Sequence, residues 1–460
     1  MSKQSGKSEP MTPIESRAAV SLAGLFSLRM LGLFMILPVF SLYAENLEGV
    51  TPTLIGVAIG AYGLTQALLQ VPFGMLSDRI GRKPVIIGGL VIFAVGSVVA
   101  AMSDTIWGVI VGRALQGSGA IAAAIMALAA DLTREQKRLR IMAVIGMSIG
   151  VAFALSMVLG PILNSFVGVQ GIFWLIAALA LVGIGITLFW VPTPEKSVFH
   201  RDAEPVPALF GRVLANSDLL RLDAGIMILH MILMAVFIVI PFALRDFIGL
   251  DSDNHSWVYL PVLLLAMIVM IPFVVIAENR RKMKPVFVAA ITALMLSLLG
   301  FSQLYHSLIG LSLMLFIFFT AFNLLEATLP SLVAKVAPAD SKGTAMGVYS
   351  TSQFSGAFLG GSIGGWVYSG YGVEGVFLFA TGAALLWLLI AIGMERPQYL
   401  TSHLVRVGAI DGAQAYELQA ELSAIDGVGD VAVDVEAGIA YLKIDTQVVE
   451  PSAFNRFAEY

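Results

Sequence analysis

The feature that most constrains this chain is a series of apolar segments, each about 20 residues long. A helix of that length crosses the ~30 Å hydrocarbon core of a bilayer, because each residue adds about 1.5 Å. The segments cover residues 18–42, 54–73, 85–102, 107–130, 141–166, 171–191, 222–244, 256–277, 285–304, 308–334, 343–367 and 375–394. Since 58% of the residues are hydrophobic and 13% are charged, the sequence predicts an all-α membrane protein with twelve transmembrane helices.

Lys and Arg are concentrated in every second connector, which fixes the expected orientation. The connectors near 43–53, 103–106, 167–170, 305–307 and 368–374 contain no Lys or Arg. Four of the other connectors hold Arg79, Arg82, Lys83, Arg134, Lys137, Arg138, Arg140, Arg280, Arg281, Lys282, Lys284, Lys335 and Lys342, and only Arg245 lies near an outer end. Positive residues remain on the cytoplasmic side, and an even number of helices returns the chain to that side. We therefore expect both termini to be cytoplasmic.

An internal repeat divides the apolar segments into two groups of six. Val167–Phe173 reads Val-Gly-Val-Gln-Gly-Ile-Phe, and Tyr371–Phe377 reads Tyr-Gly-Val-Glu-Gly-Val-Phe at the same place in the second group. Such a repeat is typical of transporters whose two halves move around a central site. We expect an N-terminal segment at 1–16, halves at 17–191 and 222–394, and a cytoplasmic linker at 192–221.

The chain changes character after a second linker at 395–402. Residues 403–460 alternate like strands near 404–407, 431–435 and 439–444, and they read as helices near 413–422 and 451–457. The order βαββα predicts a small α+β ferredoxin-like domain on the cytoplasmic side. The chain has no Cys, so a thiolate metal site is excluded there and elsewhere. Ligand sensing or docking is one hypothesis for this domain, and a contribution to stability or assembly is the other.

One short polar stretch, Gly74–Pro84, holds an acid, three bases and two glycines between two apolar segments. It resembles the loop motif of the major facilitator superfamily between helices 2 and 3. Arg113–Ala120 resembles the fourth-helix motif of the drug/proton antiporter branch. Gly160-Pro161 resembles the fifth-helix motif of that branch, although Asn164-Ser165 replaces two usual glycines. With its C-terminal domain, the whole chain is similar to the YajR-type subgroup of bacterial inner-membrane transporters.

This resemblance implies a conformational latch on the cytoplasmic face. Asp78 would lie at the N-terminus of the eleventh helix, beneath Gly343, where backbone N–H groups and the helix dipole favour an anion. Arg82 would pair with Asp131. The residues assigned to the latch are Gly74, Asp78, Arg79, Gly81, Arg82, Asp131 and Gly343. The alternative is ordinary positive-inside sorting with solvated charges, which explains the bases but neither Asp78 nor the two glycines.

Charged and titratable residues inside the apolar segments are candidates for proton coupling, because such residues are costly in a membrane. They are Arg29, Arg113, Glu326 and His230. For Arg113 the resemblance implies a part in proton transfer, with Gln116 beside it. A structural hydrogen bond is the alternative for each of them. Asp223 is close enough to the end of its helix to be interpreted as an interfacial acid.

Other residues of the apolar segments are candidates for the substrate pathway or for helix packing. Polar pathway candidates are Gln66, Gln70, Gln116, Asn323 and Gln353, and the aromatic wall candidates are Phe34, Phe237, Phe322 and Phe354. Small residues let helices approach closely. The packing candidates are Gly117, Gly119, Gly160, Pro161, Gly360 and Gly364.

These observations favour a secondary transporter in a bacterial inner membrane, with protons and a small molecule as its partners. The first hypothesis is proton-driven export of amphipathic or drug-like compounds. The alternatives are a proton-coupled metabolite symporter and a transporter-fold sensor that signals through residues 403–460. No nucleotide loop, metal-ligand cluster or nucleophile–base pair stands out in the sequence. We therefore expect neither enzyme activity, cofactor nor bound metal, and no nucleic-acid partner.

Overall fold

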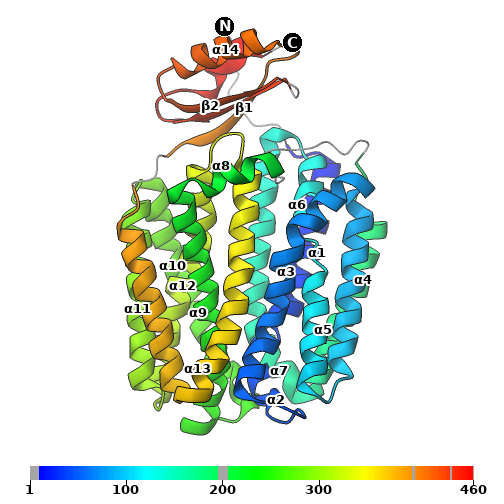
Figure 1. The fold of residues 1–460 in the computed structure, drawn as a ribbon, viewed down its shortest axis with the longest axis vertical. Helices are drawn as coiled ribbons and strands as arrows, with labels where there is room; N and C mark the ends of the chain where they lie inside the picture. The colour runs from blue at the N-terminus through cyan, green and yellow to red at the C-terminus, as the bar shows by residue number, and fades with distance from the viewer. Residues whose placement is uncertain (1–9, 195–205, 396–398, 436–437, 459–460) are drawn as a thin grey trace.

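The protein is a bundle of long helices with a small sheet at one end (Figure 1), as seen in a computed structural model. The structure describes residues 10–194, 206–395, 399–435 and 438–458. Parts of the predicted N-terminal segment and of both linkers therefore lie outside the described residues. We call the end of the bundle that carries the sheet the domain end, and the opposite end the far end.

The N-terminal half contains six crossings built from seven helices. Its helices are α1 (Pro13–Phe34), α2 (Leu37–Ala44), α3 (Pro52–Ile80), α4 (Arg82–Ala101), α5 (Ile106–Ser118), α6 (Ala122–Asp131) and α7 (Glu135–Phe189). The first predicted segment is broken into α1 and α2 near Pro38, and the fourth is broken into α5 and α6 after Gly119. Thr12, Thr51 and Thr105 accept hydrogen bonds from backbone N–H groups at the starts of α1, α3 and α5.

The C-terminal half repeats this arrangement. Its elements are η1 (Pro207–Leu209), α8 (Phe210–Leu214), α9 (Ser217–Phe242), the π-helical turn η2 (Ala243–Phe247), η3 (Ser252–Asn254), α10 (Ser256–Asn279), α11 (Met283–Leu304), α12 (Leu308–Val336) and α13 (Lys342–Ile392). Among the described residues, ten helical stretches are long and apolar enough to cross a membrane.

Two of those stretches account for two crossings each. α7 has 55 residues and α13 has 51, about twice what a bilayer requires. Each is interrupted by one glycine with φ of +65°, Gly168 in α7 and Gly372 in α13. These glycines occupy the same place in the heptapeptide repeat, where glycine adopts a positive φ without strain. Twelve crossings in two similar halves are the predicted fold, which the structure confirms (Figure 1).

In each half, a lysine at the corresponding position caps the C-terminal end of the last helix. Lys83 Nζ donates to the carbonyl of Val191 at 2.7 Å, just after the end of α7. Lys284 Nζ donates to the carbonyl of Ile392 at 3.0 Å, at the end of α13. A cation at a helix C-terminus pairs with its unsatisfied carbonyls and with the helix dipole. In the sequence each of these lysines precedes a proline, Lys83-Pro84 and Lys284-Pro285, and this partial repeat corresponds to a repeated helix cap.

The C-terminal domain consists of β1 (Thr401–Arg406), α14 (Gly412–Ser423), β2 (Val428–Asp434), β3 (Ile439–Ile444) and the 3₁₀ helix η4 (Pro451–Phe457). β3 lies between β1 and β2 and is antiparallel to both. Val405, Leu422, Leu442 and Phe454 lie in its core. The predicted order of elements is confirmed, with a 3₁₀ helix as the last one, and the small sheet fits a ferredoxin-like domain.

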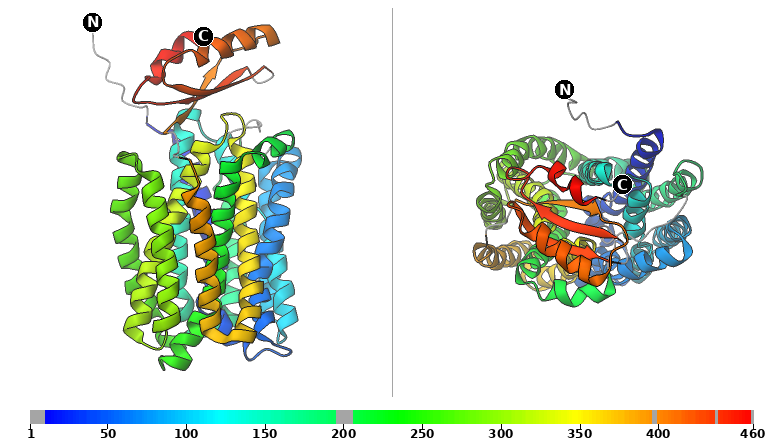
Figure 2. Two further views of the ribbon diagram at one scale, coloured as in Figure 1. Left: turned by 60° about the vertical axis from the view of Figure 1, so that its left-hand side comes forward. Right: turned by 90° about the horizontal axis from the view of Figure 1, so that it is seen from above.

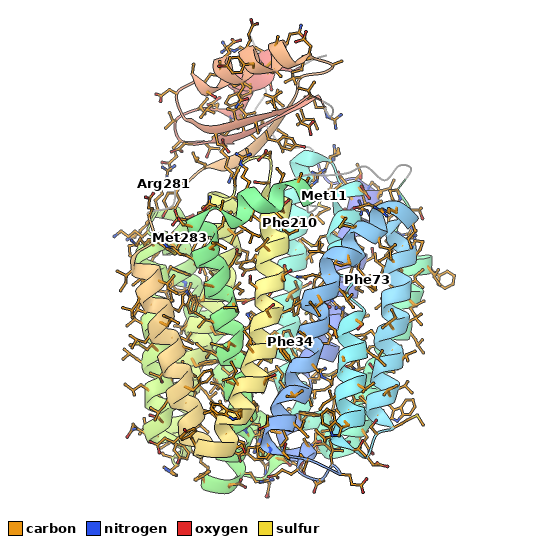
Figure 3. All side chains as sticks on the ribbon, viewed as in Figure 1. Met11, Phe34, Phe73, Phe210, Arg281 and Met283 are labelled. Carbon is orange, nitrogen blue, oxygen red and sulfur yellow. The ribbon has the colours of Figure 1, made fainter. Side chains whose placement is uncertain are left out.

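This domain rests on the C-terminal half at the domain end (Figure 2). Arg281, in the connector between α10 and α11, forms an ion pair with Asp445 at 2.6 Å; Figure 3 places Arg281 below the domain. Lys443 of β3 donates to the carbonyls of Ala334 at 2.6 Å and Lys335 at 2.9 Å, near the end of α12. The Asp430 carboxylate accepts a hydrogen bond from the Ala339 N–H at 2.9 Å.

Candidate functional site

The polar loop between α3 and α4 is held by a buried ion pair. Arg82 Nε lies 3.2 Å from an oxygen of Asp131, and the exposed fractions of the two side chains are 3% and 0%. Arg82 also donates to Ser77 Oγ at 2.8 Å and forms an ion pair with Asp78. Gly81 has φ of +96°, a conformation that favours glycine. The structure thus brings together Arg82 and Asp131, as predicted, and ties the start of α4 to the end of α6.

The structure does not bring Asp78 to the start of α13. Among the described residues, the Asp78 carboxylate bonds to Arg82 of its own half and forms no hydrogen bond with Gly343 or Thr344. The Thr344 hydroxyl instead accepts a hydrogen bond from the Val206 N–H at 2.9 Å. Gly74 packs against Ala123, and Arg79 is exposed. The expected contact between the halves is therefore absent in this conformation, and the latch stays a proposal.

The halves meet closely towards the far end. Gly56 of α3 packs directly on Gly361 of α13, where an added Cβ would overlap the Gly361 carbonyl oxygen. Arg245 and Glu45 form an ion pair between the halves at 2.7 Å. The predicted packing glycines have similar surroundings inside each half: an added Cβ would overlap backbone atoms at Gly117, Gly119, Gly160 and Gly360, and would crowd Ala235 at Gly364. Pro161 is buried within α7.

Three predicted residues from three helices meet in the C-terminal half. Gln353 Nε2 of α13 lies 2.9 Å from His230 Nε2 of α9 and 3.2 Å from Glu326 Oε1 of α12. His230 Nδ1 is 3.3 Å from the Ile226 carbonyl. The second Glu326 oxygen has no hydrogen-bond partner and lies 3.9 Å from His230 Nε2. Asn323, one turn before Glu326, is half-buried and takes no part in this group.

Aromatic rings connect this group to the N-terminal half. Phe322 of α12 lies 5.9 Å from the His230 ring and stacks on Phe153 of α7 at 5.7 Å. Phe153 in turn contacts Phe34 of α1 at 4.9 Å, edge to face; Figure 3 shows Phe34 near mid-height of the bundle. Phe237 lies 6.1 Å from Phe319. The sequence did not single out Phe153, because one Phe among small apolar residues carries no positional signal.

Two predicted arginines share one tyrosine in the N-terminal half. Arg29 of α1 donates to Gln66 Oε1, and Arg113 of α5 donates to Gln116 Oε1 at 2.9 Å. The Arg29 and Arg113 guanidinium carbons lie 5.8 Å and 5.4 Å from the centre of the Tyr62 ring. Tyr62 was not predicted, although it is the one tyrosine in the second apolar segment. Gln70, a turn beyond Gln66, donates to Thr351 of the other half at 2.8 Å.

Asp223 is buried inside the protein near the start of α9. The residue is 5% exposed, and neither carboxylate oxygen has a hydrogen-bond partner. It lies about two turns into α9, beyond the first polar turn. The interpretation as an interfacial acid stays a prediction.

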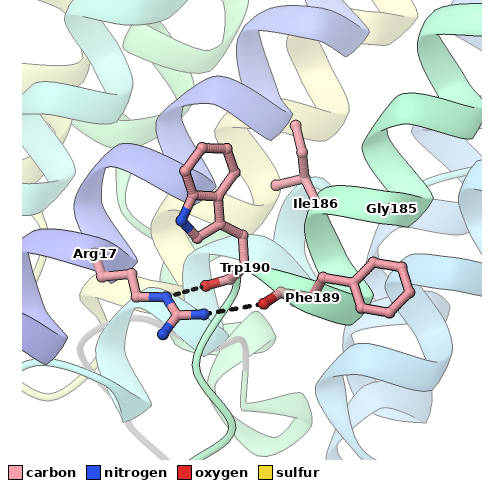
Figure 4. A pocket seen from close by; sticks show the side chains of 5 residues that line it. All are labelled: Arg17, Gly185, Ile186, Phe189 and Trp190. Carbon is pink, nitrogen blue, oxygen red and sulfur yellow. Dashed lines mark hydrogen bonds between the residues drawn. The ribbon is translucent and has the colours of Figure 1, made fainter.

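A groove of about 580 Å³ lies at the end of α7 and is lined by Arg17, Gly185, Ile186, Phe189 and Trp190 (Figure 4). Arg17 donates to the Trp190 carbonyl at 2.6 Å and to the Phe189 carbonyl at 3.0 Å. Through these bonds the Arg17 guanidinium caps the C-terminal end of α7. The groove is separate from the polar groups described above.

Comparison with known proteins agrees with this architecture. The family model described as Major Facilitator Superfamily matches residues 22–361. The chain belongs to this superfamily. It is 48% identical over 451 residues to "Inner membrane transport protein YajR" of Escherichia coli (strain K12), which covers 97% of both chains. It is 24% identical over 340 residues to "Multidrug resistance protein MdtH" of Yersinia pestis (strain Pestoides F), covering 74% of this chain and 83% of that one.

The fold is also that of solved transporters. A bacterial homologue of the human lysosomal transporter Spinster, in an inward-facing and occupied conformation, superposes with a TM-score of 0.68. It is 12% identical and covers 83% of this chain and 96% of its own. Membership of the superfamily makes this chain a multi-pass inner-membrane transporter of small molecules and not an enzyme.

Proposed function

We propose that this protein is a proton-driven exporter of small amphipathic or drug-like compounds that works by alternating access. The observation that carries the proposal is the contact of Glu326, His230 and Gln353 beside aromatic rings that connect the halves. The name of the Yersinia relative, a multidrug resistance protein, supports export. In this proposal the domain end faces the cytoplasm, in agreement with the Lys and Arg pattern.

The hydrogen bonds of this group suit a proton site. If His230 Nδ1 donates to the Ile226 carbonyl, its Nε2 accepts one N–H of the Gln353 amide. The second N–H of that amide donates to Glu326 Oε1. Gln353 therefore donates to both neighbours, with His230 Nε2 and Glu326 Oε1 as the acceptors. The unpartnered Glu326 oxygen is the atom that binds and releases the proton, and His230 stands 3.9 Å from it.

The movement of the halves gives the latch its place in the cycle. In the present conformation the far end is closed by Gly56 against Gly361 and by the Arg245–Glu45 ion pair. When the far end opens, the domain end closes, and the start of α13 approaches the loop of Asp78. The N–H groups at that start are favourable partners for a carboxylate. Asp78 would then exchange its bond to Arg82 for one to α13.

Proton flux in proteoliposomes tests the proposal. With a pH gradient across vesicles that contain the full chain, a panel of amphipathic compounds should produce compound-dependent proton movement. Glu326→Gln should reduce it at least tenfold, because an amide cannot carry the proton. Glu374→Gln, an exposed acid of the far-end connector, is the matched control and should retain the flux. Unchanged flux in Glu326→Gln would remove Glu326 from coupling, and flux with none of the compounds would refute proton-driven export.

A further inference from the structure

Two buried arginines of the N-terminal half, Arg29 and Arg113, have no acidic partner among the residues that the structure describes. Arg29 and Arg113 are each 2% exposed. Neither forms an ion pair with an Asp or Glu of the described residues, and both lie within 6 Å of the Tyr62 ring. Guanidinium groups stay charged in proteins. Two positive charges are thus held together in the interior of a membrane domain, where charge is costly without a partner.

Several hydrogen-bond donors in this cluster are also unused. Arg29 Nε and Nη1, Gln66 Nε2 and Tyr62 Oη are buried and have no hydrogen-bond partner. The acceptors present, Gln66 Oε1 and Gln116 Oε1, receive one N–H each from Arg29 and Arg113. The planar fork of a guanidinium matches two oxygens of a carboxylate or similar anion. What this cluster lacks is therefore a negatively charged acceptor.

The two structural explanations for such arginines do not apply here. An arginine that snorkels brings its head to the membrane surface, but both residues are almost fully buried. An arginine in a structural ion pair needs a carboxylate beside it, but the buried acids of this half, Glu15 and Asp131, pair with Arg134 and Arg82. The cluster is instead a preformed set of donors in a helix bundle.

The cluster borders the interface that opens during transport. Tyr62 lies 6.2 Å from Phe354 of the C-terminal half, and Gly63 packs against the same residue. A displacement of α13 from α3 therefore uncovers the Tyr62 side of the cluster. The aromatic rings at Phe34 and Phe153 supply apolar surface in the same half.

We propose that Arg29 and Arg113 bind the anionic group of the transported molecule, so that the cargo is an organic anion with an apolar body. This inference rests on the proposed export function and narrows its substrate class. An inside-negative membrane potential favours outward movement of an anion and inward movement of a proton alike. Export of an anion against proton entry is thus driven by the potential in both steps.

Binding of three matched probes to the purified full chain in detergent tests this site. The probes are naphthalene-2-carboxylate, its uncharged amide and the corresponding naphthylmethylammonium, each titrated by thermal stabilisation of the protein. We expect the carboxylate to bind at least tenfold more tightly than the other two. Arg29→Gln should abolish this preference. Arg17→Gln, an exposed arginine on the same helix, should keep it.

If Arg29→Gln does not fold, the order in which the three probes bind to the wild-type protein still tests the anion site. Equal binding of carboxylate and amide, tightest binding of the ammonium, or no binding of the carboxylate would each overturn the anion site. A preference that survives in Arg29→Gln would do the same. Because no proton gradient is present, the result is independent of coupling: carboxylate binding without proton flux would refute proton-driven export and leave the anion site standing.

Discussion

The Arg82–Asp131 pair gives a prediction whose size follows from burial. Removing one member of a buried ion pair leaves the other charge uncompensated, which costs about 3–5 kcal/mol. Asp131 is fully buried, and Asp131→Asn leaves the buried Arg82 with the partly exposed Asp78, so this variant should lower the free energy of unfolding by up to about that amount. Asp78 contacts the same arginine, but its side chain is 30% exposed. Solvent screens that contact, and Asp78→Asn should cost about 1 kcal/mol or less.

Both variants are compared by unfolding the purified protein in increasing concentrations of a denaturing detergent. The circular-dichroism signal of the helices follows the loss of structure and gives the free energy of unfolding of each variant. The double variant Arg82→Met, Asp131→Leu is the control, because replacing both charges by apolar groups leaves no buried charge. It should be more stable than Asp131→Asn alone. Equal losses for Asp78→Asn and Asp131→Asn would show that burial does not govern these contacts, and the reasoning would fail.

Two further predictions concern the far end and the C-terminal domain. Gly56→Leu should overpack the contact with Gly361 by about 1–3 kcal/mol, and the far end should then open. Spin-label distances across that end would show this opening, with Gly88→Leu, which faces open space, as the unchanged control. Burial lowers the pKa of Lys443 to about 8, below its ordinary value of 10.5. The docked domain therefore binds that proton less tightly than the released domain, and docking should strengthen as pH rises from about 8 to 10.5. Hydrogen exchange of β3 would follow docking, and a Lys443→Met protein that keeps this pH dependence would contradict the assignment.

Much of the fold follows from patterns that depend on one segment at a time. Apolar length predicts each crossing, and the repeated glycines predict that Gly168 and Gly372 occupy equivalent turns. The contact between Arg82 and Asp131 was also predictable, since it belongs to a recognised motif. Each of these features depends on residues whose order along the chain already limits where they can lie.

Features that depend on which helices are neighbours were harder to predict. Glu326, His230 and Gln353 were each proposed from the sequence, but their contact was not, because helical periodicity does not state which faces meet. The Tyr62 ring lies near two arginines from different helices, and no residue close to Tyr62 in the sequence indicates these contacts. The missing contact of Asp78 with α13 has another cause: a transporter alternates between conformations, and one structure holds the contacts of one of them.

The attachment of the C-terminal domain has a practical consequence. Arg281, Lys443 and Asp430 fasten it to connectors of the C-terminal half, so the sheet turns as that half turns. A bulky antibody fragment fixed to the outer helix α14 would then be carried sideways over the neighbouring half in every cycle. Collision of the antibody fragment with the neighbouring half would slow turnover without blocking the path of the transported molecule. Binding at this surface could therefore be used to hold the transporter in one conformation.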